Sequence, residues 1–361
     1  MSQSVFIIAE AGVNHNGSMD LARQLIDVAA TAGADAVKFQ TFRSEAVISR
    51  AAKKAEYQVT NTGAAESQLE MVRKLELGVE EHRILIEYAR SRNIRFLSTP
   101  FDIESLRVLV DVFNLPQLKI PSGEITNLPL LLAAGRSGRP LIVSTGMATL
   151  GEVEQTLMAL AFAMSTSVGA RPTMAAMKAA FLSESGQRLL KERVSLLHCT
   201  TEYPAPVADV NLKAMSAMRI AFGLPVGYSD HTEGIHVAVA AAALGATIIE
   251  KHFTTDRTLP GPDHVASLEP AELTAMVGAI RDIEQALGNG IKIPAPSEVK
   301  NITVARKSLV AVQDIPKGTF FSAENLTTKR PGTGVCAMRF DEFLGRPALR
   351  NYQADELIDG D

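Results

Sequence analysis

The sequence predicts an α/β fold, a (β/α)8 TIM barrel followed by a small C-terminal module, from three observations. Eight short and nearly continuous apolar runs occur before residue 260, as expected of parallel strands that are buried on both faces. Helical patterns separate most of these runs, and such an alternation is the order of elements in a (β/α)8 barrel. The 361 residues exceed the roughly 250 of such a barrel, which leaves room for one further small module.

The strands and the first helix follow from the local pattern. The runs that we expect to be strands span residues 5–10, 36–41, 95–100, 117–122, 140–145, 194–201, 225–229 and 247–253. An Asn-Gly-Ser sequence ending at Ser18 gives a helix-start signal, after which Leu21, Leu25 and Val28 recur at helical spacing. The first crossover helix is therefore expected directly after the first strand.

Two connections are longer than barrel loops usually are. We expect the first, residues 42–80, to reach over the active-site end of the barrel. The second, residues 163–193, contains Met174, Met177 and Phe181 at helical spacing and is expected to add a helix.

The barrel domain is predicted to cover residues 1–288. Residues 289–303 contain Gly-rich and Pro-rich stretches and are expected to form a stiff linker. Residues 304–361 contain short β-like runs and turns, but too little apolar sequence for a large core of their own. We expect a small mixed module there.

Composition excludes several classes of protein. The formal net charge of −4 comes without a long block of like charges, and 46% of residues are hydrophobic, so we expect a globular protein that does not bind nucleic acid. The longest late apolar stretch, residues 237–249, is too short for a membrane span, and the N-terminus lacks the features of a signal peptide. Two cysteines, without disulfide-framework or zinc-ligand spacing, suit a reducing compartment. We therefore expect a cytoplasmic protein without membrane contact.

Polar side chains stand at the end of almost every predicted strand, and the carboxyl ends of barrel strands carry the active site in this fold. They are Glu10, Lys38, Gln40, Thr99, Lys119, Ser122, Glu124, Thr145, Thr201, Tyr203, Ser229, His231, Glu250 and His252. A single Ser or Thr at such a place can cap the following helix as readily as it can contact a substrate. The collective pattern, more than any one member, predicts an enzyme.

The charged and imidazole groups allow several roles. A buried lysine must bind an anion, pair with a carboxylate or titrate with a lowered pKa, so Lys38 and Lys119 would suit a phosphate. His231 and His252 end neighbouring strands and could bind one divalent ion together with water and substrate, or form a hydrogen-bonding pair. By strand alternation, Lys251 should face the helices if His252 faces inward.

The remaining candidates are assigned less narrowly. His82 and His236 lie in predicted helices and are expected at the surface, whereas His198 is expected to be a hydrogen-bonded barrel residue. His15 either organises its loop or contacts substrate. The carboxylates Glu10, Glu124 and Asp263 could each be a general base, an acceptor for a sugar hydroxyl or a partner of a lysine.

Several ordered motifs run along nearly the whole chain. In the barrel they are AEAGVNHNG from Ala9, VKFQTF from Val37, STPFD from Ser98, KIPSGE from Lys119, STGM from Ser144, HCTTEYP from His198, YSDHT from Tyr228, EKHF from Glu250 and GPDH from Gly261. This set resembles the sialic acid synthase family, which includes N-acetylneuraminate, legionaminate and pseudaminate synthases. The tail motifs ARKSL, DIPKG and KRPGTG resemble the antifreeze-like (SAF, β-clip type) domain of those enzymes.

The resemblance implies a transferase that forms a C–C bond with phosphoenolpyruvate, and it implies roles for matching residues. The implied phosphoenolpyruvate contacts are Lys38, Gln40, Thr99, Lys119, Ser122, Thr201 and Ser229. The implied metal ligands are His231 and His252, for Mn²⁺ or Mg²⁺. The implied sugar contacts are Glu10, Tyr203, Asp263 and, from the partner in a domain-swapped homodimer, Arg330.

Proton transfer is assigned to Glu124, with Glu10 as the second catalytic carboxyl group. One position departs from the pattern, since some family members have Asn where this chain has Thr201. A threonine hydroxyl can still donate one hydrogen bond to a phosphate.

The motifs look closest to legionaminate synthases, which implies condensation of phosphoenolpyruvate with 2,4-diacetamido-2,4,6-trideoxy-D-mannose to N,N'-diacetyllegionaminate. The alternative is an N-acetylneuraminate synthase that uses N-acetyl-D-mannosamine. A Schiff-base pyruvate aldolase with Lys38 or Lys119 as nucleophile is a further alternative. A non-enzymatic carbohydrate- or ice-binding protein is disfavoured, because an inert barrel has no need of so many polar strand ends.

Overall fold

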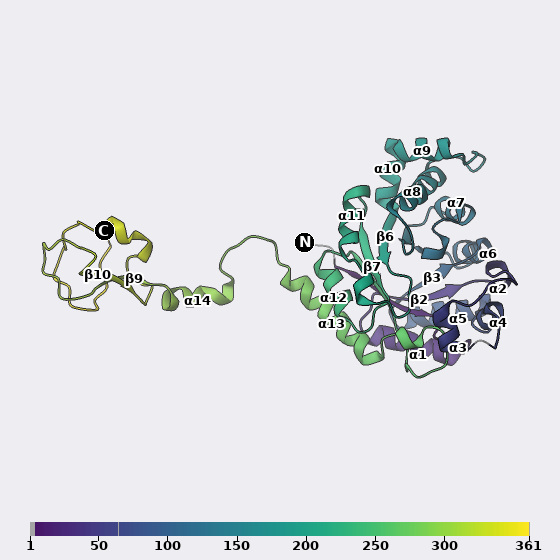
Figure 1. Cartoon of the computed structure of the whole chain (residues 1–361), viewed down its shortest axis with the longest axis horizontal. Helices are drawn as coiled ribbons and strands as arrows, with labels where there is room; N and C mark the ends of the chain where they lie inside the picture. The colour runs from purple at the N-terminus through teal and green to yellow at the C-terminus, as the bar shows by residue number, and fades with distance from the viewer. Residues whose placement is uncertain (1–3, 64, 361) are drawn as a thin grey trace. The chain divides into compact units, whose positions relative to one another are not determined.

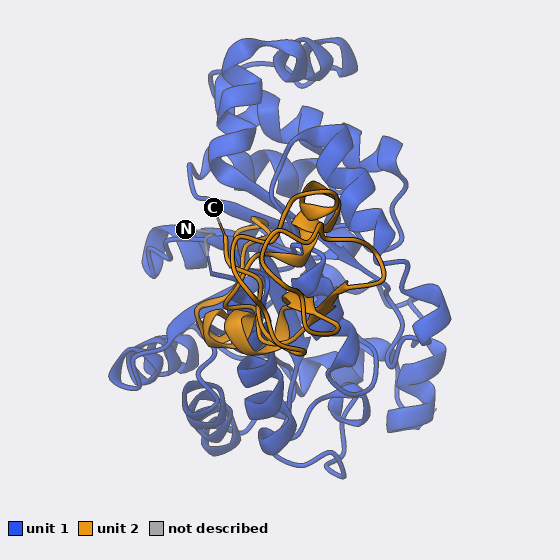
Figure 2. Ribbon diagram, turned by 90° about the vertical axis from the view of Figure 1, so that its left-hand side faces the viewer, with its two compact units in different colours: residues 1–288 blue, residues 289–361 orange. Residues whose placement is uncertain are grey.

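The computed structural model describes residues 4–63 and 65–360. The chain divides into two compact units, Met1–Gly288 and Asn289–Asp361, which Figure 2 shows in blue and orange. The first unit is an eight-stranded parallel barrel with helices on its outside (Figure 1). The predicted fold class is therefore confirmed for the barrel.

Each strand of the barrel overlaps one of the predicted runs. The strands are β1 (Phe6–Gly12), β2 (Ala36–Thr41), β3 (Arg95–Pro100), β4 (Leu118–Ile120), β5 (Leu141–Ser144), β6 (Val194–Cys199), β7 (Val226–Asp230) and β8 (Ile248–His252). Hydrogen-bonded neighbours follow the order β3-β2-β1-β8-β7-β6-β5-β4, and β3 also contacts β4. All pairings within this sheet are parallel.

The inside of the barrel is layered. Ile8, Ala36 and Leu97 belong to one small apolar cluster, together with residues of β5, β6 and β8. Side chains two residues apart on a strand share a face, so the next inward positions on these three strands are Glu10, Lys38 and Thr99. The polar layer therefore rests on an apolar one, while the other strand faces pack against the helices in the main core.

Several helices of the first unit begin directly after a residue whose side chain caps them. They are α1 (Met19–Thr31), α2 (Ser44–Val47), α3 (Glu56–Thr62), α4 (Gln68–Arg73), α5 (Val79–Ser91), α6 (Ile103–Arg107), α7 (Leu128–Arg136), α8 (Leu150–Ser165), α9 (Met174–Leu182), α10 (Glu184–Arg193), α11 (Lys213–Phe222), α12 (His236–Ala243) and α13 (Pro270–Ala286). The hydroxyl of Ser18 accepts a hydrogen bond from the Leu21 amide at the start of α1, as an N-cap does. Within the described part of the chain, no helix is long and apolar enough to cross a membrane.

Both long connections contain helices. Residues 163–193 contain all of α9 and α10, which pack on α8. Residues 42–80 form α2, α3 and α4. Two hydrogen bonds hold this segment: the Ser44 hydroxyl near its start donates to the Glu76 carboxylate near its end over 2.8 Å, and the Asn61 amide in its middle donates to the Pro262 carbonyl over 2.7 Å.

The second unit contains α14 (Pro296–Ala305), β9 (Ser308–Ala311), β10 (Leu326–Lys329) and α15 (Phe340–Phe343). Strands β9 and β10 pair antiparallel, and the unit has its own small core around Leu309 and Phe321. Helix α14 occupies much of the stretch expected to be a linker at 289–303. Its Pro296 stands at the first helical position, where a missing amide hydrogen costs nothing.

The surface position expected for His82 is wrong. His82 is 1% exposed and lies on the face of α5 that also buries Leu85 and Ala89. Its ring nitrogens bond to the Thr41 hydroxyl and the Gly78 carbonyl, both over 2.8 Å. Residues three apart in a helix lie on the same face, so a histidine three residues before a buried leucine is expected to be buried as well.

Candidate active site

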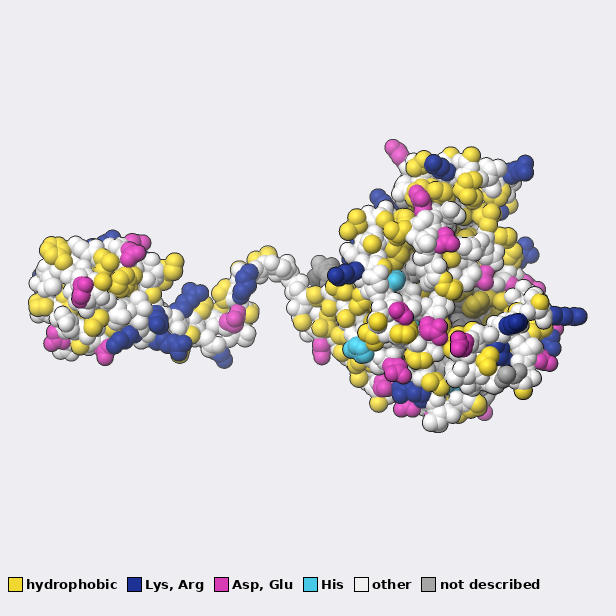
Figure 3. Space-filling model, viewed as in Figure 1, with side chains coloured by type: hydrophobic (Ala, Val, Ile, Leu, Met, Phe, Trp, Pro, Cys, Tyr) yellow, Lys and Arg dark blue, Asp and Glu magenta, His cyan; other side chains and the backbone are white. Residues whose placement is uncertain are grey.

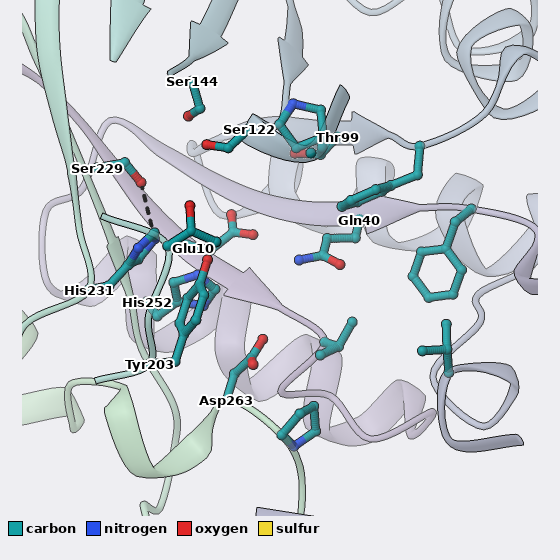
Figure 4. A pocket seen from close by; sticks show the side chains of 18 of the residues that line it. Glu10, Gln40, Thr99, Ser122, Ser144, Tyr203, Ser229, His231, His252 and Asp263 are labelled. Carbon is teal, nitrogen blue, oxygen red and sulfur yellow. Dashed lines mark hydrogen bonds between the residues drawn. The ribbon is translucent and has the colours of Figure 1, made fainter. Parts of the chain in front are cut away.

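A cavity of about 340 Å³ opens at the carboxyl ends of the barrel strands. Many of the side chains that the sequence singled out line it (Figure 4). They are Glu10, Lys38, Gln40, Thr99, Lys119, Ser122, Thr201, Tyr203, Ser229, His231, Glu250, His252 and Asp263. The strand-end pattern thus converges on one place.

Four buried charges form the floor of the cavity, which we define as Glu10, Lys38, Lys119 and Glu250. The Lys38 ammonium lies 2.6 Å from a Glu10 oxygen and 3.6 Å from Glu250, and Lys119 lies 3.2 Å from Glu250. Lys38 also donates to the Thr99 hydroxyl over 2.9 Å. Opposite charges at these distances allow all four groups to be buried together.

The two floor carboxyl groups differ in acidity. Burial raises the pKa of Glu10 to about 7, against the opposing effect of Lys38. Burial also acts to raise the pKa of Glu250, but Lys119 and Lys38 outweigh it and hold that pKa well below its usual range. Glu250 therefore stays ionised, whereas Glu10 titrates near neutral pH and is able to exchange a proton.

Glu250 had no role assigned from sequence, although it stands among the polar strand ends. It connects three of the groups expected to hold phosphoenolpyruvate, since its carboxylate contacts both floor lysines and accepts a hydrogen bond from the Ser229 hydroxyl over 2.9 Å. The available signal was period-two alternation, which places Glu250 on the same face of β8 as His252.

His231 and His252 lie side by side, with ring centroids 5.5 Å apart. The Nδ1–H of His231 donates to the Thr200 carbonyl over 2.6 Å, so its Nε2 carries the lone pair. Ser229 lies 3.5 Å from that Nε2 but gives its hydrogen to Glu250. Burial lowers the pKa of His231 to about 4 and that of His252 well below its usual range, so both rings are neutral.

Neutral imidazoles are the form that binds metal, and a carbonyl partner on the far nitrogen is the usual orienting contact. The pair therefore fits a divalent ion. Among residues 4–63 and 65–360, no group of three or more His, Cys, Asp or Glu side chains is arranged to hold one. Water and substrate would have to complete the coordination.

A hydroxyl group without a partner faces the same cavity. The Thr201 Oγ1 is buried and has no hydrogen-bond partner among the described residues, and it lies beside Ser122. Gly146 packs against both, since a Cβ at that position would stand 2.3 Å from the Thr201 hydroxyl and 2.8 Å from the Ser122 hydroxyl. Glycine at this position leaves room for both hydroxyl groups, and the Thr201 hydroxyl has a hydrogen that it could donate to a ligand.

The wall beside the histidines is aromatic and acidic. The Tyr203 ring lies 4.2 Å from the His231 ring and 5.2 Å from Tyr57 of α3. Asp263 lies below Tyr203 in Figure 4, and burial raises its pKa to about 6. These groups could orient a polyhydroxylated ligand.

One of the residues expected in the site, Glu124, stands elsewhere in the barrel unit. Glu124 does not line the cavity, and its Oε2 accepts a hydrogen bond of 2.6 Å from Asn127. It follows Ser122 in a 3₁₀ turn, in which successive side chains point about 120° apart, so the turn directs only Ser122 and Gly123 to the cavity. Arg330 belongs to the second unit, where its Nε donates to the Ala305 carbonyl over 3.0 Å.

His15 and His198 take structural places. The Nδ1 of His15 accepts a hydrogen bond from the Gly17 amide over 3.0 Å, so it organises its own loop. His198 donates to the Val210 carbonyl over 2.7 Å, as expected of a hydrogen-bonded barrel residue.

Comparison with protein families matches residues 25–292 to the NeuB family and residues 306–361 to the SAF domain. The chain is 52% identical to the N,N'-diacetyllegionaminic acid synthase of Campylobacter jejuni subsp. jejuni serotype O:2, covering 99% of both chains. It is 43% identical to the N,N'-diacetyllegionaminic acid synthase of Legionella pneumophila subsp. pneumophila, covering 99% of this chain and 94% of that one.

A solved structure is also similar. It is the N-acetylneuraminic acid synthetase of Leptospira borgpetersenii serovar Hardjo-bovis in complex with citrate, with a TM-score of 0.65 and 36% identity. The likeness covers 83% of this chain and 90% of that one.

Proposed function

The chain belongs to the NeuB family of phosphoenolpyruvate-dependent nonulosonic acid synthases, and we propose that its own reaction joins phosphoenolpyruvate to 2,4-diacetamido-2,4,6-trideoxy-D-mannose. The products are N,N'-diacetyllegionaminate and phosphate. The observation that carries the proposal is the floor of two buried lysines beside two neutral histidines. The high identity to legionaminic acid synthases supports this choice of acceptor.

Phosphoenolpyruvate would bind on the floor. Lys38 and Lys119 supply positive charge, and charge-assisted hydrogen bonds from a lysine to a phosphate or carboxylate are stronger than neutral ones. Hydroxyl and amide groups around them complete the proposed contacts: Gln40, Thr99, Ser122, Thr201 and Ser229. Glu250 positions both lysines through its carboxylate.

In the proposed reaction, C3 of phosphoenolpyruvate forms a bond to the aldehyde carbon of the open-chain sugar. Water then adds at C2, and the tetrahedral intermediate releases phosphate by cleavage of its C–O bond. Enzymes of this family use a divalent metal ion, and we propose that His231 and His252 hold Mn²⁺ or Mg²⁺, which would supply Lewis-acid polarisation of the aldehyde oxygen.

Proton transfer falls to one of two carboxyl groups. The geometry favours Glu10, because it lines the cavity and contacts Lys38. For Glu124 to take part, its side chain must leave Asn127 and turn into the cavity. If Glu124 does turn inward, Glu10 would hold a sugar hydroxyl; otherwise Glu10 would move the proton itself.

The sugar would lie against Tyr203 and Asp263. We propose that Arg330 of a partner subunit completes this site in a domain-swapped homodimer, and the SAF match over residues 306–361 supports the presence of the domain that would supply it. Lys and Arg side chains gather around α14 on the face of the second unit in Figure 3. A basic surface suits a contact with anionic substrate.

We also place the reaction in the cytoplasm, a location that suits two cysteines that are both free thiols.

An N-acetylneuraminate synthase is the second candidate, favoured by the similarity to the Leptospira enzyme. For the Schiff-base aldolase, Lys38 is unsuited as the nucleophile, because it is ion-paired with Glu10 and its pKa is raised, whereas a nucleophilic amine needs a lowered pKa. Burial lowers the pKa of Lys119, so Lys119, which is ion-paired with Glu250, is the nucleophile that this alternative would use.

The test is phosphate release from phosphoenolpyruvate with Mn²⁺, with either 2,4-diacetamido-2,4,6-trideoxymannose or N-acetylmannosamine, and with or without chelator. Release that depends on metal and is faster with the diacetamido sugar supports the proposal. A clear preference for N-acetylmannosamine would instead select the second candidate.

A further inference from the structure

The cavity has two chemically different ends. The floor and the histidine pair lie at one end, and Gln40 lies toward the other, away from Ser229 and His231 in Figure 4. Apolar side chains also line the cavity, and we call five of them the apolar wall: Phe42, Met71, Val72, Leu75 and Phe101. All but Phe101, which follows β3, come from the connection 42–80.

The apolar wall is preformed. Phe42, Leu75 and Val13 form a buried cluster of their own, with Val72 and Phe101 packed against it. The rings of Phe42 and Phe101 meet edge to face with centroids 6.1 Å apart. A wall built in this way keeps its shape without ligand, and none of its side chains carries a strong hydrogen-bonding group.

We propose that the apolar wall is the subsite for the unreacted end of the acceptor sugar, and that it selects a terminal methyl group over a hydroxymethyl group. The inference rests on the proposed function and adds the structural basis of acceptor choice. The aldehyde carbon has to reach phosphoenolpyruvate on the floor, so the far end of an extended open-chain sugar points toward the opposite end of the cavity.

The two candidate acceptors differ at that far end. The trideoxy sugar ends in a methyl group, which gains by leaving water for an apolar surface. N-acetylmannosamine ends in a hydroxymethyl group, which would lose hydrogen bonds to water without replacement at the wall. The amide side chains of Gln40, Gln58 and Gln68 also line the cavity and can donate to and accept from the acetamido groups.

The test places one hydroxyl group in the wall without changing its shape. Val72→Thr is nearly isosteric, and kcat/KM is measured for both sugars with the wild type and the variant. We expect the preference for the trideoxy sugar over N-acetylmannosamine to fall by about 10-fold, the lower end of what one such group is worth in an apolar pocket. The matched control is Val79→Thr at the start of α5, outside the cavity and 43% exposed, which should leave the ratio unchanged.

A second variant guards against loss of folding. Val47 of α2 lines the rim of the cavity and is 37% exposed, so Val47→Thr should fold normally and shift the ratio in the same direction by less. A ratio unchanged in both folded variants would overturn the subsite while leaving the synthase intact. If the wild type shows no metal-dependent phosphate release with either sugar, the proposed function is wrong, and the inference that rests on it is wrong as well.

Discussion

Lys251 and Asp230 form a fully buried ion pair, with Nζ 2.8 Å from Oδ2, on the faces of β8 and β7 that point away from the cavity. The two residues are direct partners in the parallel pairing of these strands. Each is the chain neighbour of one histidine of the proposed metal site, His252 and His231. The pair thus joins the two strand ends from behind, as strand alternation predicted for Lys251.

Lys251→Met is expected to weaken folding and metal binding together. It leaves the Asp230 carboxylate buried without its counter-charge, which typically costs about 3–5 kcal/mol. Urea denaturation measures the loss of stability, and Mn²⁺ titration of the purified chain measures the loss of affinity.

The double variant Asp230→Asn with Lys251→Met is the matched control, because it removes both charges. It should recover much of the stability, since a neutral pair has no unpaired charge to bury. Equal losses in the single and double variants would show that the ion pair does not carry the effect.

His231→Ala and His252→Ala are each expected to reduce Mn²⁺ affinity by more than the roughly 10- to 100-fold that loss of an outer contact costs. The reason is that each removes a neutral imidazole with a free lone pair. Calorimetric titration of the apo chain measures this directly, with exposed His236→Ala as the control. Unchanged affinity in both variants would exclude these histidines as ligands.

Glu10→Gln is expected to lower kcat by about 10²- to 10⁴-fold, the usual contribution of a positioned acid or base. Glu124→Gln should lower it less, since Glu124 is bonded to Asn127 outside the cavity. Steady-state kinetics at saturating substrate compare the two. The reverse order would assign proton transfer to Glu124 and require its side chain to turn inward.

Asp263→Asn is expected to stabilise the ligand-free chain more at pH 8 than at pH 5. Burial raises the pKa of Asp263 to about 6, above its ordinary value, so the folded state binds this proton more tightly than the unfolded state does. The free energy of unfolding of the wild type therefore falls as pH rises through 6. Between pH 5 and pH 8, the free energy of unfolding of the variant relative to that of the wild type should rise by about 1–2 kcal/mol. Urea denaturation at both pH values measures it, and exposed Asp209→Asn should show no such trend.

Arg330→Ala is expected to impair use of the sugar more than binding of phosphoenolpyruvate. If the arginine serves a partner subunit, mixing this variant with Glu10→Gln should restore activity in the mixed dimers, because each dimer then retains one complete site. Lys317→Ala, another basic residue of the second unit, should behave as wild type. Lack of recovery after verified subunit exchange would place Arg330 outside a shared site.

The polar residues at the ends of the predicted strands were enough to find most of the floor. They included Glu10, Lys38 and Lys119, and the closed parallel barrel brings these strand ends together. Glu124 escaped the same reasoning, because it follows the strand in a 3₁₀ turn whose direction no alternation rule gives. Helix α14 was missed because Pro296 looks the same in a linker and at the first position of a helix.

The apolar wall was beyond prediction for a different reason. Its residues belong to short helices in a long connection, and whether Val72 faces the cavity or solvent depends on how α4 packs against residues far away in sequence, such as Val13. Local pattern carries no information on such contacts. Alternation along β8 could have placed Glu250 inside the barrel. Its role in pairing with both Lys38 and Lys119 could not be predicted without the structure.

The four floor charges sum to zero before any ligand arrives. If phosphoenolpyruvate binds on the floor as proposed, it brings several negative charges to a buried place, so each bound molecule would have to be accompanied by a positive charge from outside. A proton taken up by Glu10, whose pKa lies near 7, or a divalent cation at the histidines could supply it. Ligand affinity should therefore be thermodynamically linked to pH and to cation concentration, and the heat of binding should change with the ionisation enthalpy of the buffer.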